Sequence, residues 1–230
     1  MILSKFKRFI IRSFFKPTNI TKVSVEPVSK SFGFDRGTPI DRYYIEKFLS
    51  NNSAYIQGVC MEIAERDYTI KFGGSKVSRA YVLHVENQCD ELSIKGNLEN
   101  GEGIPENFVD CFIVTQTLPF IYDVRQVAKN IIKVLKPGGV ALITVPGITQ
   151  ISRYDMDRWG HFWSFTDLTV KRLFSELVPE ENIDINTYGN VKVASSFLYG
   201  LCLEEISHED LDHHDKNYQL IITAKITKPL

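Results

Sequence analysis

Short apolar runs alternate with amphipathic helical patterns along most of the chain. Seven segments have the length and apolar pattern of strands: 59–64, 82–85, 92–94, 109–115, 140–145, 183–188 and 218–226. Four segments repeat apolar residues at helical spacing: 39–50, 124–135, 167–177 and 194–206. Strands that alternate with helices predict an α/β fold with a mostly parallel sheet that is buried on both faces.

Capping and turn residues set the ends of two of these helices. Thr38 has the character of an N-cap, Pro39 suits the first helical position and Asp41 places a carboxylate in the first turn. The Lys-Pro-Gly-Gly run at 136–139 ends the helix that begins near Val124 and leads into a buried strand. These signals place the helix–turn–strand order independently of the apolar pattern.

The start of the chain differs from the rest. Six basic residues precede the first acidic residue, Glu26, and apolar side chains lie between them at helical spacing. This pattern is typical of an amphipathic helix on an anionic membrane surface, and equally of a helix packed on its own domain or on a partner subunit. It is too interrupted to span a bilayer, and no small-residue cleavage site follows it. We therefore divide the chain into a basic segment with its linker, 1–30, and a domain, 31–230, with peripheral membrane contact through 1–16 as a hypothesis.

Composition argues against several classes of partner. The chain is acidic overall after its basic start, so we expect no general nucleic-acid-binding surface. The four cysteines are widely spaced and form no Cys-x-x-Cys motif, which favours a reducing cytoplasm over a disulfide framework or a zinc site. The run 208–215 gathers histidines and carboxylates consecutively, and we interpret it as a solvated loop with no metal. Homo-oligomerisation stays open.

Two segments in the middle of the chain resemble a known family. The first runs from Pro105 to Leu118 and the second, which contains Leu-Lys-Pro-Gly-Gly, from Leu135 to Pro146. In order and spacing they are similar to strand four, its active-site loop, the next helix and strand five of class I S-adenosylmethionine-dependent methyltransferases. The resemblance implies a Rossmann-like, mostly parallel seven-stranded sheet with helices on both faces. It also implies S-adenosyl-L-methionine as the cofactor.

The same resemblance implies where the cofactor binds. Glu62 matches the acidic residue that ends the first strand, whereas Ala64, Arg66 and Tyr68 stand where glycines are expected, so the cofactor loop departs from the family pattern. The ribose carboxylate after strand two corresponds to Glu86, or to Tyr81 if that strand ends earlier. The full set of cofactor-binding residues that we expect is Glu62, Ala64, Glu65, Tyr81, Glu86, Asn97, Leu98, Thr115, Gln116 and Thr117.

Two further segments, 31–44 and 159–166, look like a bacterial methyltransferase-domain subfamily associated with polysaccharide and glycosyl-transfer pathways. They are rich in charged and aromatic residues, which suit a sugar or nucleotide-sugar acceptor. The alternative is a salt-bridged cap over the sheet. The acceptor-binding residues that we expect are Asp35, Arg36, Arg42, Arg153, Tyr154, Arg158, Trp159 and Trp163.

Methylation of a hydroxyl requires a general base, and the available types in this region are His161, Asp155 and Asp157, of which His161 is the first choice. A carboxylate acceptor would require none, and a histidine between aromatic residues is as often a packed side chain. The leading hypothesis is methylation, at oxygen, of a glycan, sugar nucleotide or sugar-linked acceptor by a cytoplasmic enzyme, peripheral on the inner membrane face if 1–16 binds lipid. The lost glycines, Asn97 and the basic start support an alternative, a non-catalytic partner or scaffold in a membrane-associated glycan assembly complex. A dinucleotide-dependent oxidoreductase ranks third, because no Gly-x-Gly-x-x-Gly follows the first strand.

Overall fold

The computed structural model describes residues 24–86 and 90–230. The basic amphipathic segment 1–16 and the first part of the linker lie outside the described residues, so the helix predicted there stays a prediction. The described end of the linker contacts the domain: the backbone N–H groups of Val28 and Ser29 donate to the Tyr199 carbonyl at 2.8 and 3.3 Å. It therefore packs against a helix close to the other end of the sequence.

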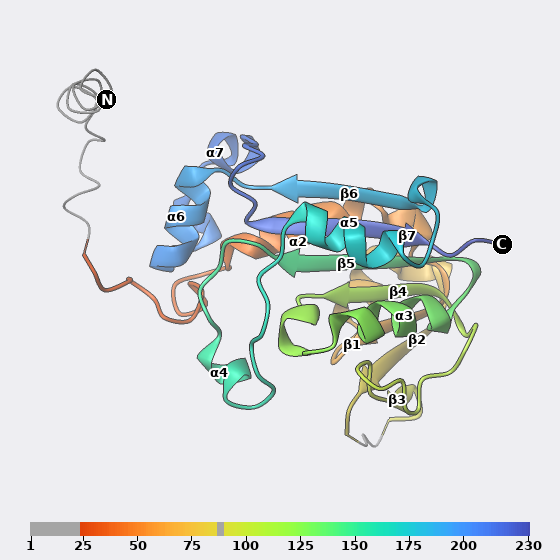
Figure 1. Ribbon diagram of the computed structural model, residues 1–230. Coiled ribbons are helices and arrows are strands. Elements are labelled where there is room, and N and C mark those ends of the chain that lie inside the picture. Colours follow the sequence, from red (N-terminus) through yellow and green to blue (C-terminus); the bar gives the residue numbers. More distant parts are fainter. Residues whose placement is uncertain (1–23, 87–89) are drawn as a thin grey trace, which may run out of the picture.

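A single seven-stranded sheet forms the centre of the domain, in the order β3-β2-β1-β4-β5-β7-β6 (Figure 1). The last strand in the sequence, β7, pairs antiparallel with both of its neighbours. The pairs among β3, β2, β1, β4 and β5 are parallel. The strand bounds are β1 Gly58–Ile63, β2 Val77–His84, β3 Ser93–Lys95, β4 Val109–Thr115, β5 Leu135–Pro146, β6 Ile183–Tyr188 and β7 Ile221–Thr227. The predicted mostly parallel sheet is confirmed.

Helices cover both faces of the sheet. In Figure 1, α3 (Val124–Val134) and α5 (Asp167–Ser175) lie in front of the sheet and α2 (Ile40–Asn51) lies behind it. The remaining helices are α4 Arg153–Met156, α6 Val191–Tyr199 and α7 His208–Asp212. The short helical turns are η2 Ser53–Tyr55, η3 Thr69–Gly73, η4 Gly74–Lys76, η5 Leu118–Phe120, η6 Glu180–Asn182 and η7 Leu203–Glu205. Predicted layers on both faces are therefore present.

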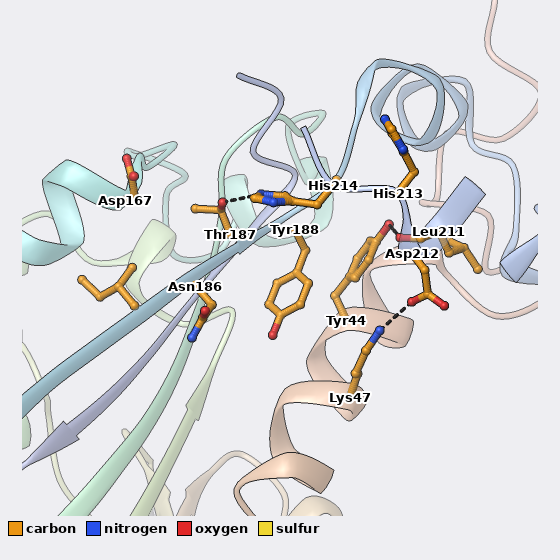
Figure 2. Close-up of a pocket in the computed structure, with 12 residues that line it drawn as sticks. Tyr44, Lys47, Asp167, Asn186, Thr187, Tyr188, Leu211, Asp212, His213 and His214 are labelled. Atoms are coloured by element: carbon orange, nitrogen blue, oxygen red, sulfur yellow. Dashed lines mark hydrogen bonds and ion pairs between the residues drawn. The ribbon is translucent and has the colours of Figure 1, made fainter. Parts of the chain in front are cut away.

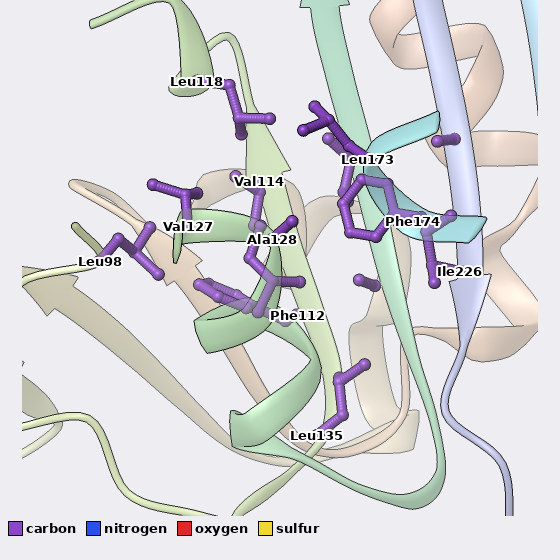
Figure 3. Packing of buried hydrophobic residues seen from close by; sticks show 14 of the residues in the cluster. Leu98, Phe112, Val114, Leu118, Val127, Ala128, Leu135, Leu173, Phe174 and Ile226 are labelled. Carbon is purple, nitrogen blue, oxygen red and sulfur yellow. The ribbon is translucent and has the colours of Figure 1, made fainter. Parts of the chain in front are cut away.

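The middle strand β4 shows why both layers are needed. Its successive side chains point to opposite faces. Phe112 and Val114 join the cluster with α3 and α5 (Figure 3), whereas Cys111 and Ile113 join the cluster with α2. All four are fully buried. Each face thus has an apolar surface that only a packed helix layer removes from water.

The structure corrects the limits of several predicted elements, among them the fifth strand, which begins at Leu135 rather than at residue 140. The helix predicted over 194–206 begins at Val191 and ends at Tyr199, because Gly200 adopts φ 77° and terminates it. The second strand begins at Val77, five residues earlier than its apolar run. The predicted loop 208–215 contains the short helix α7, which Ser207 caps by accepting from the Asp210 N–H at 3.2 Å.

No helix within 24–86 and 90–230 combines the length and the apolar character that crossing a bilayer requires.

Asn190 joins three elements at the end of β6, and its substitution tests that junction. The side chain caps α6 by accepting from the Val193 N–H at 3.0 Å, and it donates to the carbonyls of Asp210 and His213 at 2.7 Å each. Because Asn190 is buried, Asn190→Ala removes a cap and leaves two carbonyls unpaired. We expect the free energy of unfolding to fall by about 2 to 3 kcal/mol in urea denaturation.

Asn186→Ala is the matched control. Asn186 is exposed, and its amide contacts Asp184 at 3.1 Å on the same strand, so its loss should change the free energy by less than about 0.5 kcal/mol. Equal effects for the two variants would contradict a junction role for Asn190.

Candidate functional site

A cavity of about 630 Å³ opens at the carboxyl ends of the parallel strands. Ile63 lines it from β1, Ala64 from the turn that follows, His84 from β2, Thr115 from β4 and Pro146 from β5. In open α/β sheets this edge is where ligands bind, because the loops that leave parallel strands converge there. A cavity of this size accommodates a nucleoside-sized ligand. The sheet therefore positions one candidate site.

Alanine takes a glycine-like conformation at the first turn of this site. Ala64 has φ 66°, in the left-handed region that glycine adopts more readily. Gln116, after β4, also has a positive φ of 50°. Two loops that line the cavity thus turn sharply with side chains present, and the turn after β1 keeps its left-handed conformation although the expected glycine is missing.

Glu62 fixes the rest of that loop through hydrogen bonds. Its carboxylate accepts from the backbone N–H of Thr69 at 2.8 Å and from the Thr69 hydroxyl at 2.9 Å. Glu62 and Thr69 are both buried. Burial raises the pKa of Glu62 to about 7, and the hydrogen bonds from Thr69 act against that shift. Glu62 therefore shapes the loop, and it is outside the lining of the cavity among the described residues.

Half of the expected cofactor residues meet in the cavity. Ala64, Glu86, Thr115, Gln116 and Thr117 line it. The others make different contacts, and Leu98 is buried in the core.

Two of those others have side-chain contacts that explain their position, and a third points to solvent. Tyr81 packs on Phe108 with ring centroids 5.0 Å apart. The Asn97 side chain accepts from the Glu99 N–H at 2.8 Å in a local turn, and Glu65 is exposed. Of the two residues considered for the position after strand two, Glu86 therefore lines the cavity and Tyr81 does not.

The loop between β5 and α5 forms a second wall. Ser152, Asp155, Trp159 and His161 line the cavity from it. Asp155 Oδ2 accepts from the Ser152 hydroxyl at 2.6 Å, and His161 Nδ1 accepts from the Ser152 backbone N–H at 3.3 Å. Burial lowers the pKa of His161, and nearby Asp155 opposes that shift. A neutral ring whose Nδ1 accepts carries its proton on Nε2.

The expected acceptor residues divide in the same way. Arg42 and Trp159 line the cavity. Asp35 and Arg36 instead bind protein groups, the Ser29 hydroxyl and Glu205 respectively. Arg36 therefore ties the segment 29–39 to Glu205, whereas the bond between Asp35 and Ser29 lies within that segment.

The remaining members of that set lie in the β5–α5 region and make exposed contacts with other protein groups. Arg153 pairs with Asp157 at 3.2 Å. The Arg158 guanidinium lies 3.5 Å from the centroid of the Tyr154 ring. Trp163 donates to the Tyr122 carbonyl at 3.1 Å.

Several cavity residues were not among those expected from the sequence. Phe32, Phe34, Phe120 and Phe197 add an aromatic wall, and Asp41 adds a carboxyl group. These residues come from the chain's beginning, middle and end, so no local motif joins them. The signal available for Asp41 is its place in the charged and aromatic segment 31–44, but a carboxylate in the first turn of a helix is also explained by the helix dipole.

A second cavity, of about 380 Å³, lies beside β6 (Figure 2). Its polar groups bind one another: Lys47 pairs with Asp212 at 2.5 Å, and the Thr187 hydroxyl lies 2.9 Å from His214 Nε2. The hydroxyl of Tyr44 donates to the Leu211 carbonyl at 2.8 Å. Because these groups already have protein partners, the larger cavity is the stronger candidate for a ligand site.

The buried carboxyl of Glu62 makes stability depend on pH. Its raised pKa means that the folded protein keeps this proton at pH values where the unfolded chain has lost it, so stability falls as the pH rises from about 4.5 to about 7. We expect Glu62→Gln to remove up to about 3 kcal/mol of this fall. Urea denaturation between pH 4.5 and pH 8 measures it, and the variant's stability should rise relative to the native chain as pH rises.

Glu65→Gln, three residues on and exposed, is the control and should follow the native pH dependence. A native-like pH profile for Glu62→Gln would show that Glu62 titrates as an ordinary surface carboxyl.

Comparison with known families gives a match for the central part of the chain. Residues 59–143 match the model of the family described as "Methyltransferase domain". This match begins in β1 and ends within β5, and it contains half of the residues that line the cavity. A search of curated proteins gives no match.

Solved structures share the fold at low sequence identity. N-methyltransferase NodS from Bradyrhizobium japonicum, in complex with S-adenosyl-L-homocysteine, has a TM-score of 0.53 and 15% identity over 88% of this chain and 94% of its own. A SAM-dependent methyltransferase from Archaeoglobus fulgidus has a TM-score of 0.51 and 10% identity over 81% of this chain and 94% of its own. The cyclase SpnF has a TM-score of 0.52 and 12% identity over 90% of this chain and 89% of its own. The fold alone therefore does not specify a reaction. The chain therefore has the Rossmann-like fold of class I S-adenosylmethionine-dependent methyltransferases, and its residues 59–143 match the model of a methyltransferase domain.

Proposed function

We propose that this domain transfers a methyl group from S-adenosylmethionine to an oxygen of a sugar, a sugar nucleotide or a sugar-linked molecule. One observation carries the proposal: Asp155, Trp159 and His161 line the same cavity as the carboxyl ends of β1, β2 and β4. Polar and aromatic side chains of the β5–α5 loop therefore lie beside the strands that bind the cofactor in this fold. The association with polysaccharide pathways is part of the proposal.

The described residues fit the cofactor. Glu86 lies beyond the end of β2, where a carboxylate accepts from ribose hydroxyls. Thr115, Gln116 and Thr117 line the cavity at the end of β4. When bound, S-adenosylmethionine supplies a methyl group on a positively charged sulfur, so the protein's task is to align the acceptor and to exclude water.

Aromatic side chains favour a sugar-like acceptor. Phe120 and Trp159 line the cavity, and Phe34 and Trp159 are more than half exposed. Such faces pack well against the C–H surfaces of a sugar ring, while neighbouring polar groups bind its hydroxyls. His161 lies edge-on to Phe120, with ring centroids 5.3 Å apart, so its orientation is held by that aromatic wall.

Asp155 is the better proton acceptor of the two catalytic candidates that line the cavity. In the proposed reaction the acceptor oxygen bonds to the methyl carbon as the carbon–sulfur bond breaks, and the hydroxyl proton passes to the Asp155 carboxylate. His161 holds its proton on Nε2 while Nδ1 accepts from Ser152. It therefore orients an acceptor oxygen by donating a hydrogen bond. Asp157 pairs with Arg153 outside the cavity lining.

Methyl transfer tests the proposed function directly. The full chain is titrated with S-adenosylhomocysteine by calorimetry and then incubated with methyl-labelled S-adenosylmethionine and a panel of free sugars, nucleotide sugars and oligosaccharides. We expect saturable binding and label in a carbohydrate. Label in amine or protein acceptors alone would overturn the acceptor class. Binding without transfer to any acceptor would favour the alternative, a non-catalytic partner in a glycan assembly complex, to which the missing glycines point.

Asp155 and Asp157 offer a matched pair for the proton-transfer step. Asp155→Asn should lower kcat by at least about a hundredfold with the carbohydrate acceptor, because a general base contributes that much. Asp157→Asn should change kcat by less than about threefold, since the exposed pair with Arg153 has a small effect. The affinity for S-adenosylhomocysteine, measured in the same preparations, should stay within about twofold for both variants. Equal kcat values for the two variants would contradict the role of Asp155.

A further inference from the structure

A buried carboxyl oxygen without a partner lies at the start of α2. Oδ1 of Asp41 has no hydrogen-bond partner among the described residues, although it is shielded from solvent. Asp41 lines the large cavity, in the first turn of α2. Buried polar groups in native proteins nearly always have a partner, so an orphaned one calls for an explanation.

The energetics make this carboxyl group costly in the free protein. Burial raises the pKa of Asp41, and the adjacent Arg42 charge and backbone N–H groups oppose that shift without cancelling it. Leaving such an oxygen unpaired is unfavourable, because no hydrogen bond offsets its removal from water. A ligand that brings an N–H donor to Oδ1 would recover that cost.

The residue next to it carries the opposite charge. Arg42 lines the same cavity, and its Nη1 donates to the Tyr68 hydroxyl at 2.9 Å. Tyr68 belongs to the loop after β1, so Arg42 is held between α2 and that loop. Its other guanidinium nitrogens have donors to spare. A carboxylate and a guanidinium side by side are complementary to the ammonium and carboxylate of an α-amino acid.

We propose that Asp41 and Arg42 bind the amino-acid end of S-adenosylmethionine, with Asp41 Oδ1 accepting from its ammonium group and Arg42 donating to its carboxylate. This inference rests on the proposed use of the cavity for that cofactor, and it adds a binding role for α2, which precedes the segment that matches the family model. The sulfonium is not the partner of Oδ1, since it has no N–H to donate. The ammonium has three.

The test compares two ligands that differ in the amino-acid end. S-adenosylhomocysteine carries the ammonium and carboxylate, and methylthioadenosine lacks both. Calorimetry at pH 7.5 should show that Asp41→Asn lowers the affinity for S-adenosylhomocysteine by about tenfold or more. The affinity for methylthioadenosine should fall by less than about twofold. Asp184→Asn is the control, because Asp184 is exposed on β6, pairs with Lys225 at 3.4 Å and is outside the cavity lining, and it should leave both affinities unchanged.

A ligand series on the native chain keeps the test independent of how the variant folds. The deaminated analogue of S-adenosylhomocysteine should bind at least about tenfold more weakly than the parent compound. If the deaminated analogue binds as tightly as the parent compound, the role of Asp41 is overturned. The same holds if Asp41→Asn lowers the affinity for both ligands equally, or for neither. If the native chain binds neither S-adenosylhomocysteine nor methylthioadenosine, the proposed function itself fails and the inference falls with it.

Discussion

The burial of β4 and β5 between two helix layers is the constraint on which the rest of the domain depends. Phe112 requires α3 on one face and Ile113 requires α2 on the other, because neighbouring residues of a strand point to opposite sides. Once both layers are in place, the loops that follow the parallel strands open at one edge of the sheet. The cavity is therefore a consequence of how the core is covered, and its chemistry comes from the side chains that the loops, the strand ends and α2 bring to it.

Two buried carboxyl groups next to that edge show how similar groups serve different ends. Glu62 is satisfied by Thr69 and holds the loop after β1 in shape. Asp41 has an oxygen without a partner and lines the cavity. Burial raises the pKa of both. The satisfied carboxyl group is structural, whereas the unsatisfied one has an unmet need for a donor, and this difference is what separates a loop anchor from a binding residue.

Local patterns predicted the sheet, because apolar runs such as 109–115 report two-sided burial directly. They also found Glu86, Asp155 and His161, which follow strands or stand in an aromatic segment. They did not separate Trp159, which lines the cavity, from Trp163, which donates to Tyr122. That distinction depends on how a loop folds back over the sheet. Nor could they show that Asp41 lacks a partner, since this depends on contacts between segments far apart in the sequence.

The aromatic side of the cavity rests on contacts of this long-range kind. The segment 29–39 is tied to the region after α6, where Thr38 Oγ1 donates to Glu204 at 2.8 Å and the Leu203 N–H donates to the Thr38 carbonyl at 2.7 Å. Phe32 reaches Phe197 there, with ring centroids 5.7 Å apart, and both line the cavity. The same segment leads directly into α2 and Asp41. The aromatic wall and the buried carboxyl group are therefore positioned together, so a change that frees 29–39 should disturb acceptor and cofactor binding at once.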